Sequence, residues 1–324
     1  MSDNLIIRTL DVMERYDFKN IRIFCNKKLS TKSLAPAFAL NEFLQHMGID
    51  SKVVINRQDD LSDIYTDSIP NIDLNRFLAI SIDCKKEIEI ENNDYRNSST
   101  LINIVSPLHS KGYGVLNFKS DLVSGTAEYL VDEIFSYCKE NQMDVPMSVA
   151  EWLYLGIIGT TRRFGANIKQ NTMLVAKQLI DYGIDYGKVC FLYEKQNIST
   201  IRCQEMILRK MIEKPNYIYA IVPLCEYENK YSQKDFTRAL SLFKNINECY
   251  MTALFIEQDD ETYKVLLASN EYYKADVKHV ARKNNGEGED LYGEAIIQDF
   301  DVNKVLGDID LACEKINKKF KEAK

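Results

Sequence analysis

Four short, largely apolar runs constrain what this chain can fold into. They are IRIFC at 21–25, SKVVIN at 51–56, FLAISIDC at 77–84 and LINIV at 101–105. A strand with one face in water alternates apolar and polar residues, whereas parallel strands that are covered on both faces are apolar almost throughout. These runs therefore predict a mostly parallel sheet enclosed between layers of other structure.

Segments with apolar residues at helical spacing separate and follow the apolar runs. Helices are expected at 3–16, 34–48, 125–141, 149–164 and 171–183. Gly48 closes the second of them, because glycine is the residue that most easily ends a helix. The alternation of strands and helices predicts a doubly wound α/β domain, in which ligands bind at the carboxyl ends of the strands.

The length of the chain and a change of pattern in its second half predict two domains. A chain of 324 residues commonly forms two. We assign residues 1–187 to the first domain and residues 188–213 to a helical linker. Residues 214–324 begin with the strand-like NYIYAIVPL and form a smaller α/β domain.

Charge and composition exclude several classes of partner. The formal net charge of −7 argues against a general attraction to nucleic-acid backbones or anionic membranes, so any phosphate must bind in a local basic pocket. No apolar run approaches the ~20 residues that span a bilayer, and the acidic, amphipathic N-terminus is unlike a secretory signal. Eight cysteines without a Cys-x-x-Cys pair predict a reduced, cytoplasmic protein.

Four loops follow the predicted strands or lie where a site is expected, at 26–32, 83–84, 105–114 and 159–164. Their sequences are NKKLSTK, DC, VSPLHSKGYG and GTTRRF. In order and spacing, and together with the helix start SGTAEYL, they resemble the motifs of the DHH phosphoesterase family. The resemblance is to its two-domain branch of nano-RNases and phosphoadenosine phosphatases. In the second domain, YKVLLAS and the glycine-bearing ARKNNGEGEDLYGEAII resemble the DHH-associated domain.

The resemblance implies a site that this sequence has largely lost. Family members hold two manganese ions with carboxylates and histidines, which polarise the phosphate and activate a water. The corresponding positions here hold Asn26, Ser30, Lys32, Val105, Ser106, Pro107 and Thr160. Asp83 is the sole retained motif carboxylate, and one carboxylate cannot retain a dinuclear site. We therefore expect no metal cofactor, no catalytic residue and no hydrolysis.

The remodelled pocket has cations where the family has metal ligands. Lys32, Lys111, Arg162 and Arg163, with Lys27 and Lys28, can lie on one rim and hold a phosphate in place of the lost ions. The alternative is that these are ordinary solvated loop charges. The ligand-binding candidates are Asn26, Ser30, Lys32, Asp83, Ser106, His109, Lys111, Thr160, Arg162, Arg163, Ser269, Gly286 and Gly288.

Several other polar residues have a plain structural interpretation. Thr126 and Glu128 read as helix-start residues rather than ligands, and Cys25 reads as core packing rather than a nucleophile. Tyr113, on the loop after the fourth strand, is a candidate for stacking on a base. In the second domain, the family's substrate-binding Arg-Ser pair falls at Ala268-Ser269, so the arginine is missing.

Three functional hypotheses follow. The first is a non-hydrolytic protein that binds a small phosphorylated nucleotide or short oligonucleotide in a cleft between the domains. The second is an interaction or scaffold protein, forming a homodimer or pairing with an active relative. The third is a phosphodiesterase or phosphatase that works with an altered site. The cations of the rim favour the first, and the missing arginine at position 268 favours the second.

Overall fold

The computed structural model describes residues 4–27, 29–55, 76–106, 111–243, 246–259, 261–289 and 291–322. The chain divides into two compact units, residues 1–195 and 196–324. The division falls within the segment predicted as a helical linker. That segment contains most of α6 (Tyr186–Glu194), which belongs to the first unit, and α7 (Ile198–Lys210), which belongs to the second.

The first unit contains a five-stranded sheet whose neighbouring strands are all parallel, in the order β2-β1-β3-β4-β5. The strands are β1 (Asn20–Phe24), β2 (Asp50–Val54), β3 (Phe77–Ile82), β4 (Leu101–Val105) and β5 (Leu116–Lys119). The first four confirm the predicted strands to within two residues. The strand β5 was not predicted, because its four residues Leu-Asn-Phe-Lys are too short and too polar to show a pattern.

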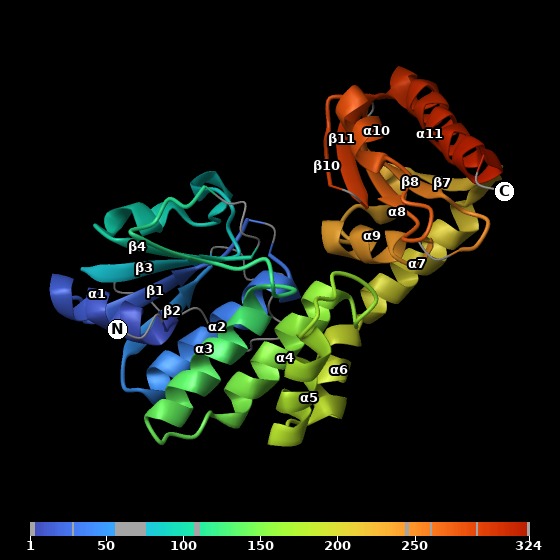
Figure 1. Ribbon diagram of the computed structural model, residues 1–324. Coiled ribbons are helices and arrows are strands. Elements are labelled where there is room, and N and C mark those ends of the chain that lie inside the picture. The colour runs from blue at the N-terminus through green and yellow to red at the C-terminus, as the bar shows by residue number, and fades with distance from the viewer. Residues whose placement is uncertain are drawn as a thin grey trace. The chain divides into compact units, whose positions relative to one another are not determined.

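Helices cover one face of this sheet, as Figure 1 shows for α2, α3 and α4. They are α1 (Leu5–Tyr16), α2 (Thr31–His46), α3 (Thr126–Glu140) and α4 (Met147–Thr161), and α5 (Thr172–Tyr182) packs against α3 and α4. Together with the strands they form the main core, which includes Ile21, Ile80 and Leu153. The opposite face carries Phe24 and Phe77 and is covered by the connection from β3 to β4, with η1 (Glu87–Glu89) and η2 (Asn93–Asn97), whose Tyr95 packs against this face.

The connections therefore lie on both faces, and the predicted doubly wound α/β fold is confirmed. From β1 the chain passes through α2 to β2 on one side, and from β3 it passes to β4 on the other. The adjacent ends of β1 and β3 are thus the point at which the strand order reverses. Open α/β sheets of this kind gather their ligands at such a point.

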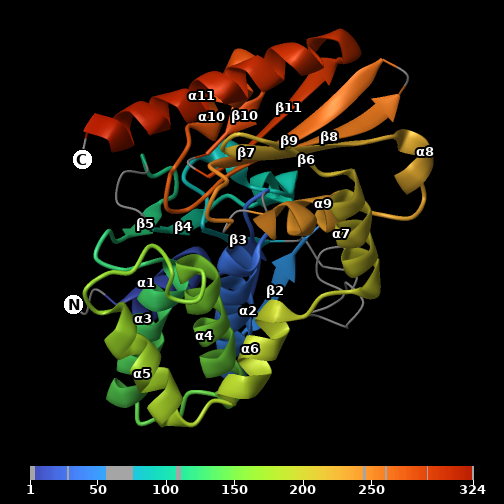
Figure 2. The same cartoon turned by 90° about the vertical axis from the view of Figure 1, so that its right-hand side faces the viewer.

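The second unit is a smaller α/β unit around a mixed six-stranded sheet, ordered β10-β11-β9-β8-β7-β6. The strands are β6 (Ile212–Lys214), β7 (Tyr217–Val222), β8 (Met251–Asp259), β9 (Thr262–Ser269), β10 (Glu287–Gly288) and β11 (Tyr292–Gln298). Among the described strands of this sheet, only β7 and β8 pair in parallel. In Figure 2, α10 (Val277–Lys283) and α11 (Val302–Glu322) cover one face of this sheet. The other face packs against α7 and α9 (Gln233–Leu240), and α8 (Leu224–Tyr227) follows β7.

The helix predicted at 149–164 ends three residues earlier in the structure. Arg162, Arg163 and Phe164 take left-handed backbone conformations, with φ of 49°, 58° and 63°. Residues other than glycine rarely adopt this backbone conformation, and those that do are concentrated at helix caps and functional sites. Among the described residues, no helix is long and apolar enough to cross a membrane.

Candidate functional site

Asn26 and Asp83 meet where β1 and β3 end. The side-chain Nδ2 of Asn26 donates a hydrogen bond to the backbone oxygen of Asp83 at 2.9 Å. Asp83 itself has a left-handed backbone, with φ of 59°, and its N–H donates to the oxygen of Ile104 at 2.9 Å. Aspartate tolerates this conformation better than most residues. Two of the predicted site residues are therefore in direct contact at the reversal of strand order.

Lys32 and Asp83 form an ion pair in this site. Lys32 Nζ lies 3.1 Å from Asp83 Oδ2, and the two side chains are 40% and 7% exposed. Burial raises the pKa of the Asp83 carboxyl, and the nearby Lys32 ammonium opposes that rise. The ammonium of Lys32 thus lies beside the carboxylate of Asp83, and their charges balance.

The beginning of α2 and the end of α4 hold Lys32 in place. Ser30 is the N-cap residue of α2, and its N–H donates to Ser33 Oγ at 3.3 Å. A side chain at Gly159 would place its Cβ 3.1 Å from Thr31 and 3.3 Å from the backbone nitrogen of Lys32. The missing side chain at 159 therefore lets α4 pack directly onto the first turn of α2.

Thr160 is buried beside the beginning of α3. Among the described residues its Oγ1 has no hydrogen-bond partner, and the same is true of the buried Oγ1 of Thr126. A Cβ at Gly125 would lie 2.8 Å from Thr160 Oγ1, so glycine is required for this approach. Unpaired buried hydroxyls are uncommon and costly, and here they gather near the predicted site.

Glu128 ties α3 to α5. Its Oε2 accepts hydrogen bonds from the Ser124 N–H at 2.9 Å and from Thr172 Oγ1 at 2.8 Å, while its Oε1 has no partner in the described part of the chain. These bonds give the buried carboxylate a structural role, in keeping with its interpretation as a helix-start residue.

Of the other predicted residues of the first unit, Ser106 and Arg163 have partners other than Lys32 and Asp83. The hydroxyl of Ser106 donates to the backbone oxygen of Ser120 at 3.0 Å. Arg163 forms an ion pair with Glu194 of α6, so its charge is balanced within the unit. Arg162 caps α4, and Lys111 is exposed. His109 lies outside the described residues, as do Lys28 and Pro107.

A polar cluster beneath the site was not predicted. The hydroxyl of Tyr113 lies 2.9 Å from Ser81 Oγ, 3.1 Å from Asn103 Oδ1 and 3.2 Å from the backbone oxygen of Cys84. Burial raises the pKa of Tyr113, so the phenol stays neutral. The hydroxyl of Tyr113 is thus engaged in the fold, and these bonds fix the position of the ring that the sequence offered as a stacking candidate. The signal was one polar residue in each of two apolar strands, since Ser81 and Asn103 are paired across β3 and β4.

The three candidates in the second unit have structural roles. Ser269 is buried, and its hydroxyl donates to the backbone oxygen of Asn270 at 3.0 Å. A Cβ at Gly286 would lie 2.1 Å from the oxygen of Glu294, and one at Gly288 would lie 2.9 Å from the Cα of Lys278. Gly286 therefore lets the backbone approach β11 closely, and Gly288 lets β10 approach α10.

The residues around Asp83 do not fit a pair of manganese ions. A hard divalent cation takes about six oxygen ligands, usually with several carboxylates. Within the described ranges, no three His, Cys, Asp or Glu side chains are grouped so that they could hold a metal ion. A cation at Asp83 would also have to displace the ammonium of Lys32, which lies 3.1 Å away.

Comparisons with known proteins agree with the motifs and the fold. No protein-family model matches the chain. It is 23% identical over 79% of its length to the bifunctional oligoribonuclease and PAP phosphatase NrnA of Bacillus subtilis, covering 82% of that protein. It is 24% identical over 69% of its length to a probable bifunctional oligoribonuclease and PAP phosphatase NrnA of Streptococcus mutans, covering 71% of that protein.

A solved structure shares the whole architecture. The exopolyphosphatase-related protein of Bacteroides fragilis superposes with a TM-score of 0.77 and 17% identity, over 98% of this chain and 97% of that one. At this level of identity the likeness concerns the fold. The two-unit α/β architecture therefore occurs in a second protein at nearly full length.

Proposed function

We propose that this is a DHH phosphoesterase-like protein of the nano-RNase and PAP phosphatase kind, and that it binds a small phosphorylated nucleotide or short oligonucleotide without hydrolysing it. Sequence similarity over most of the chain and the fold support the first part of the proposal. Its two sequence relatives are named as bifunctional oligoribonucleases and PAP phosphatases. The proposal keeps the class of ligand that those names imply and removes the hydrolytic step.

The ion pair between Lys32 and Asp83 carries the proposal. It places an ammonium 3.1 Å from the sole retained motif carboxylate. The other motif positions that the structure describes hold neutral side chains: Asn26, Ser30, Val105, Ser106 and Thr160. A general base must be within reach of its water and able to take its proton. Asp83 is buried and already paired, which makes it poorly suited to that task.

Binding of a phosphate is supported by the position of Lys32 rather than by its charge alone. The side chain is 40% exposed, so it can turn from Asp83 toward a ligand. It stands in the first turn of α2, and the N-terminus of a helix favours anions. Both features direct positive potential to the edge where the sheet reverses its order.

One observation favours the interaction or scaffold hypothesis instead. The two cations expected to replace the metals, Lys32 and Arg163, are each paired with a carboxylate of this chain. A phosphate must compete with Asp83 for the first and with Glu194 for the second. A protein that binds partners through its surface has no need to break either pair.

Calorimetry separates the two hypotheses. Mononucleotides, linear dinucleotides and cyclic dinucleotides are screened by thermal shift, because a ligand that binds only the native state raises its melting point. The best ligand is then titrated into the wild type, Lys32→Asp and Arg163→Ala. A charge-assisted hydrogen bond contributes roughly 1.5–3 kcal/mol, so Lys32→Asp should weaken binding about ten-fold or more.

Lys139→Asp is the matched control, because Lys139 is an exposed lysine in the last turn of α3 and belongs to none of the candidate loops. It changes the charge of the chain equally, and we expect it to leave the affinity close to that of the wild type. Equal affinities for all variants, or no phosphorylated ligand at all, would favour the interaction hypothesis.

Hydrolysis is tested on short oligoribonucleotides and on phosphoadenosine phosphate with added manganese. We expect no turnover above background and no stoichiometric manganese in protein purified without a chelator. Manganese-dependent turnover that disappears in Asp83→Ala would instead establish the altered-site phosphoesterase.

A further inference from the structure

Helix α7 of the second unit carries an apolar stripe on the face turned away from the core of that unit. On its inner face, Cys203 and Ile207 are buried in a hydrophobic core that is shared with α9. On its outer face, Ile198, Ile201 and Leu208 are 72%, 51% and 50% exposed. The outer face of a surface helix is normally charged or polar, so exposed aliphatic residues that share one stripe mark an interaction surface.

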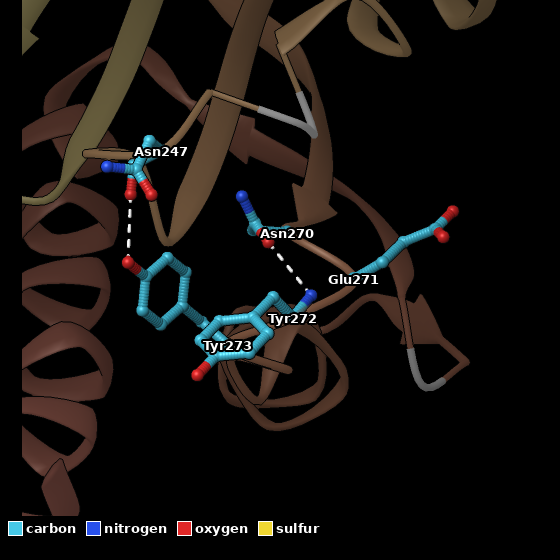
Figure 3. A pocket seen from close by; sticks show the side chains of 5 residues that line it. All are labelled: Asn247, Asn270, Glu271, Tyr272 and Tyr273. Atoms are coloured by element: carbon cyan, nitrogen blue, oxygen red, sulfur yellow. Dashed lines mark hydrogen bonds between the residues drawn. The ribbon is translucent and has the colours of Figure 1, made fainter. Parts of the chain in front are cut away.

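The exposed tyrosine of the same unit is a different case. Tyr272 and Tyr273 line a pocket after β9, and their rings meet edge-on at 5.1 Å. The Tyr273 hydroxyl also donates a hydrogen bond to the backbone oxygen of Asn247 at 2.9 Å, as Figure 3 shows. These rings therefore pack against neighbours within the unit. The three aliphatic residues of the α7 stripe, in contrast, belong to none of the hydrophobic clusters of the described chain.

The spacing of the stripe is that of a seam between two helices. Its members Ile198, Ile201, Glu205 and Leu208 follow one another at intervals of three, four and three residues. Helices pack along residues that repeat in this way, and a polar residue within such a seam sets its register. Because the intervals read the same in both directions, the seam matches a second copy of itself that lies antiparallel beside it.

The charges along the seam are also self-complementary. Within the helix, Arg209 Nη2 lies 2.5 Å from Glu205 Oε1. Arg202 is exposed three residues before Glu205. In an antiparallel pair in which Ile198 of each copy meets Leu208 of the other, Arg202 of one copy lies within about 1.5 Å of Glu205 of the other along the helix axis. The arrangement thus brings a cation and a carboxylate together twice.

We propose that this chain forms a homodimer in which α7 packs antiparallel against α7 of a second copy. The interface is isologous, so Ile198 meets Leu208 at both ends of the seam. Between the ends, Glu205 lies against Ile201 and pairs with Arg202 of the other copy. One helix face buries less area than a stable interface does, so the dimer is weak and dissociates on dilution. The dimer goes beyond the nucleotide binding proposed above, because it concerns another unit of the chain and needs no ligand.

The first test is sedimentation of the full chain over a wide range of concentrations, in which we expect reversible dissociation of a dimer. Ile198→Asp and Ile201→Asp should each weaken the dimer by at least about ten-fold, or ~1.4 kcal/mol, because each places charges at two contacts of an apolar seam. Leu311→Asp is the matched control, since Leu311 is an exposed leucine of α11 and the change in charge is equal. All three side chains are more than half exposed, so the variants should melt with the wild type.

The second test determines the orientation of the two helices with single cysteines, in a Cys225→Ser background that removes an exposed native thiol. In the antiparallel pair the two copies of position 198 lie roughly 15 Å apart along the axis, which exceeds the ~4–7 Å between the Cα atoms of a disulfide. Under mild oxidation, Ile198→Cys alone and Leu208→Cys alone should therefore form no disulfide-linked dimer. A mixture of the two variants should form one.

Reversal of charge tests the ionic contact between the copies. Arg202→Glu should weaken the dimer, and Arg202→Glu/Glu205→Arg should recover part of the lost affinity. A chain that sediments as a monomer at every concentration would overturn the proposal, as would a dimer that Ile198→Asp and Ile201→Asp weaken no more than Leu311→Asp does. Disulfides formed by Ile198→Cys alone, or no recovery in the charge-reversed variant, would overturn the antiparallel register.

Discussion

The carboxyl edge of the first sheet and the glycine loop of the second unit both resemble family motifs, yet their residues behave differently. At the edge, Asp83 is buried with a left-handed backbone, and Thr160 keeps a hydroxyl without a partner among the described residues. In the glycine loop, Gly286 and Gly288 allow close backbone approaches. Nearby, the Ser269 hydroxyl is satisfied by Asn270.

The difference indicates which of the two regions still has the character of a site. Buried charge, left-handed backbone and unpaired hydroxyls all reduce stability, and such features persist most often where function requires them. The glycine loop shows the opposite, since each of its features improves packing. We therefore expect substitutions to stabilise the first region in several cases and to destabilise the second.

The largest effect is expected for Gly286→Ala. The new Cβ would lie 2.1 Å from Glu294 O and 2.7 Å from the Cβ of Ala295, so backbone must move. Overpacking of this kind destabilises proteins by about 1–3 kcal/mol or more. Urea unfolding, with hydrogen exchange to follow the second unit, measures the loss.

Gly307→Ala in α11 is the control, because nothing lies within 4 Å of its Cβ, and it should be stabilising by ~0.5–1 kcal/mol. Equal stability of the two variants would contradict the packing role of the loop.

Lys32→Met should destabilise the first unit at neutral pH, because it leaves the buried carboxylate of Asp83 without its cation. Removing one partner of a fully buried pair costs about 3–5 kcal/mol. Because Lys32 is 40% exposed, solvent already screens the pair, and we expect ~1–2 kcal/mol. The double variant Lys32→Met/Asp83→Asn should recover most of this loss in thermal unfolding. If it recovers none, the two side chains are not energetically coupled.

Asp83→Asn alone should be stabilising at neutral pH, increasingly so as the pH rises. Burial raises the folded-state pKa of Asp83, so its protonated form favours folding below the unfolded-state pKa. That contribution is lost as the pH rises through the folded-state pKa, whereas asparagine does not titrate. Asparagine also tolerates the left-handed backbone. The difference in melting temperature between Asp83→Asn and the wild type is measured from pH 4 to pH 8. A variant that becomes less stable than the wild type at higher pH would contradict this prediction.

The smallest effects compare one hydroxyl from each region. Thr160→Val removes a buried hydroxyl without a partner in the described residues and should be neutral or stabilising by up to ~1 kcal/mol. Ser269→Ala removes a bond to Asn270 and should be destabilising by ~1 kcal/mol. The stabilities of the two variants are compared through the midpoints of their unfolding in denaturant, with one common m-value. Changes of the same sign would remove this distinction between the two regions.

Much of the fold was predictable because its signals are local. Apolar runs such as LINIV mark buried strands. Gly48, with a φ of 79°, directly follows the C-cap residue of α2, as its position in the sequence predicted. The order of these elements was enough to predict a doubly wound sheet with a smaller α/β unit after it. The Ser81–Asn103 pair was harder to recognise, since a single polar residue in an apolar strand does not reveal its partner on the next strand.

The sequence by itself determined most of the elements, their order and the residue types of the loops that resemble family motifs, because each depends on residues at neighbouring positions. Only the tertiary structure decided that Lys32 pairs with Asp83 and that Arg163 pairs with Glu194. The sequence had offered both cations to a phosphate. The physical reason is that charges interact through space, and folding brings together carboxylates and cations that lie far apart along the chain.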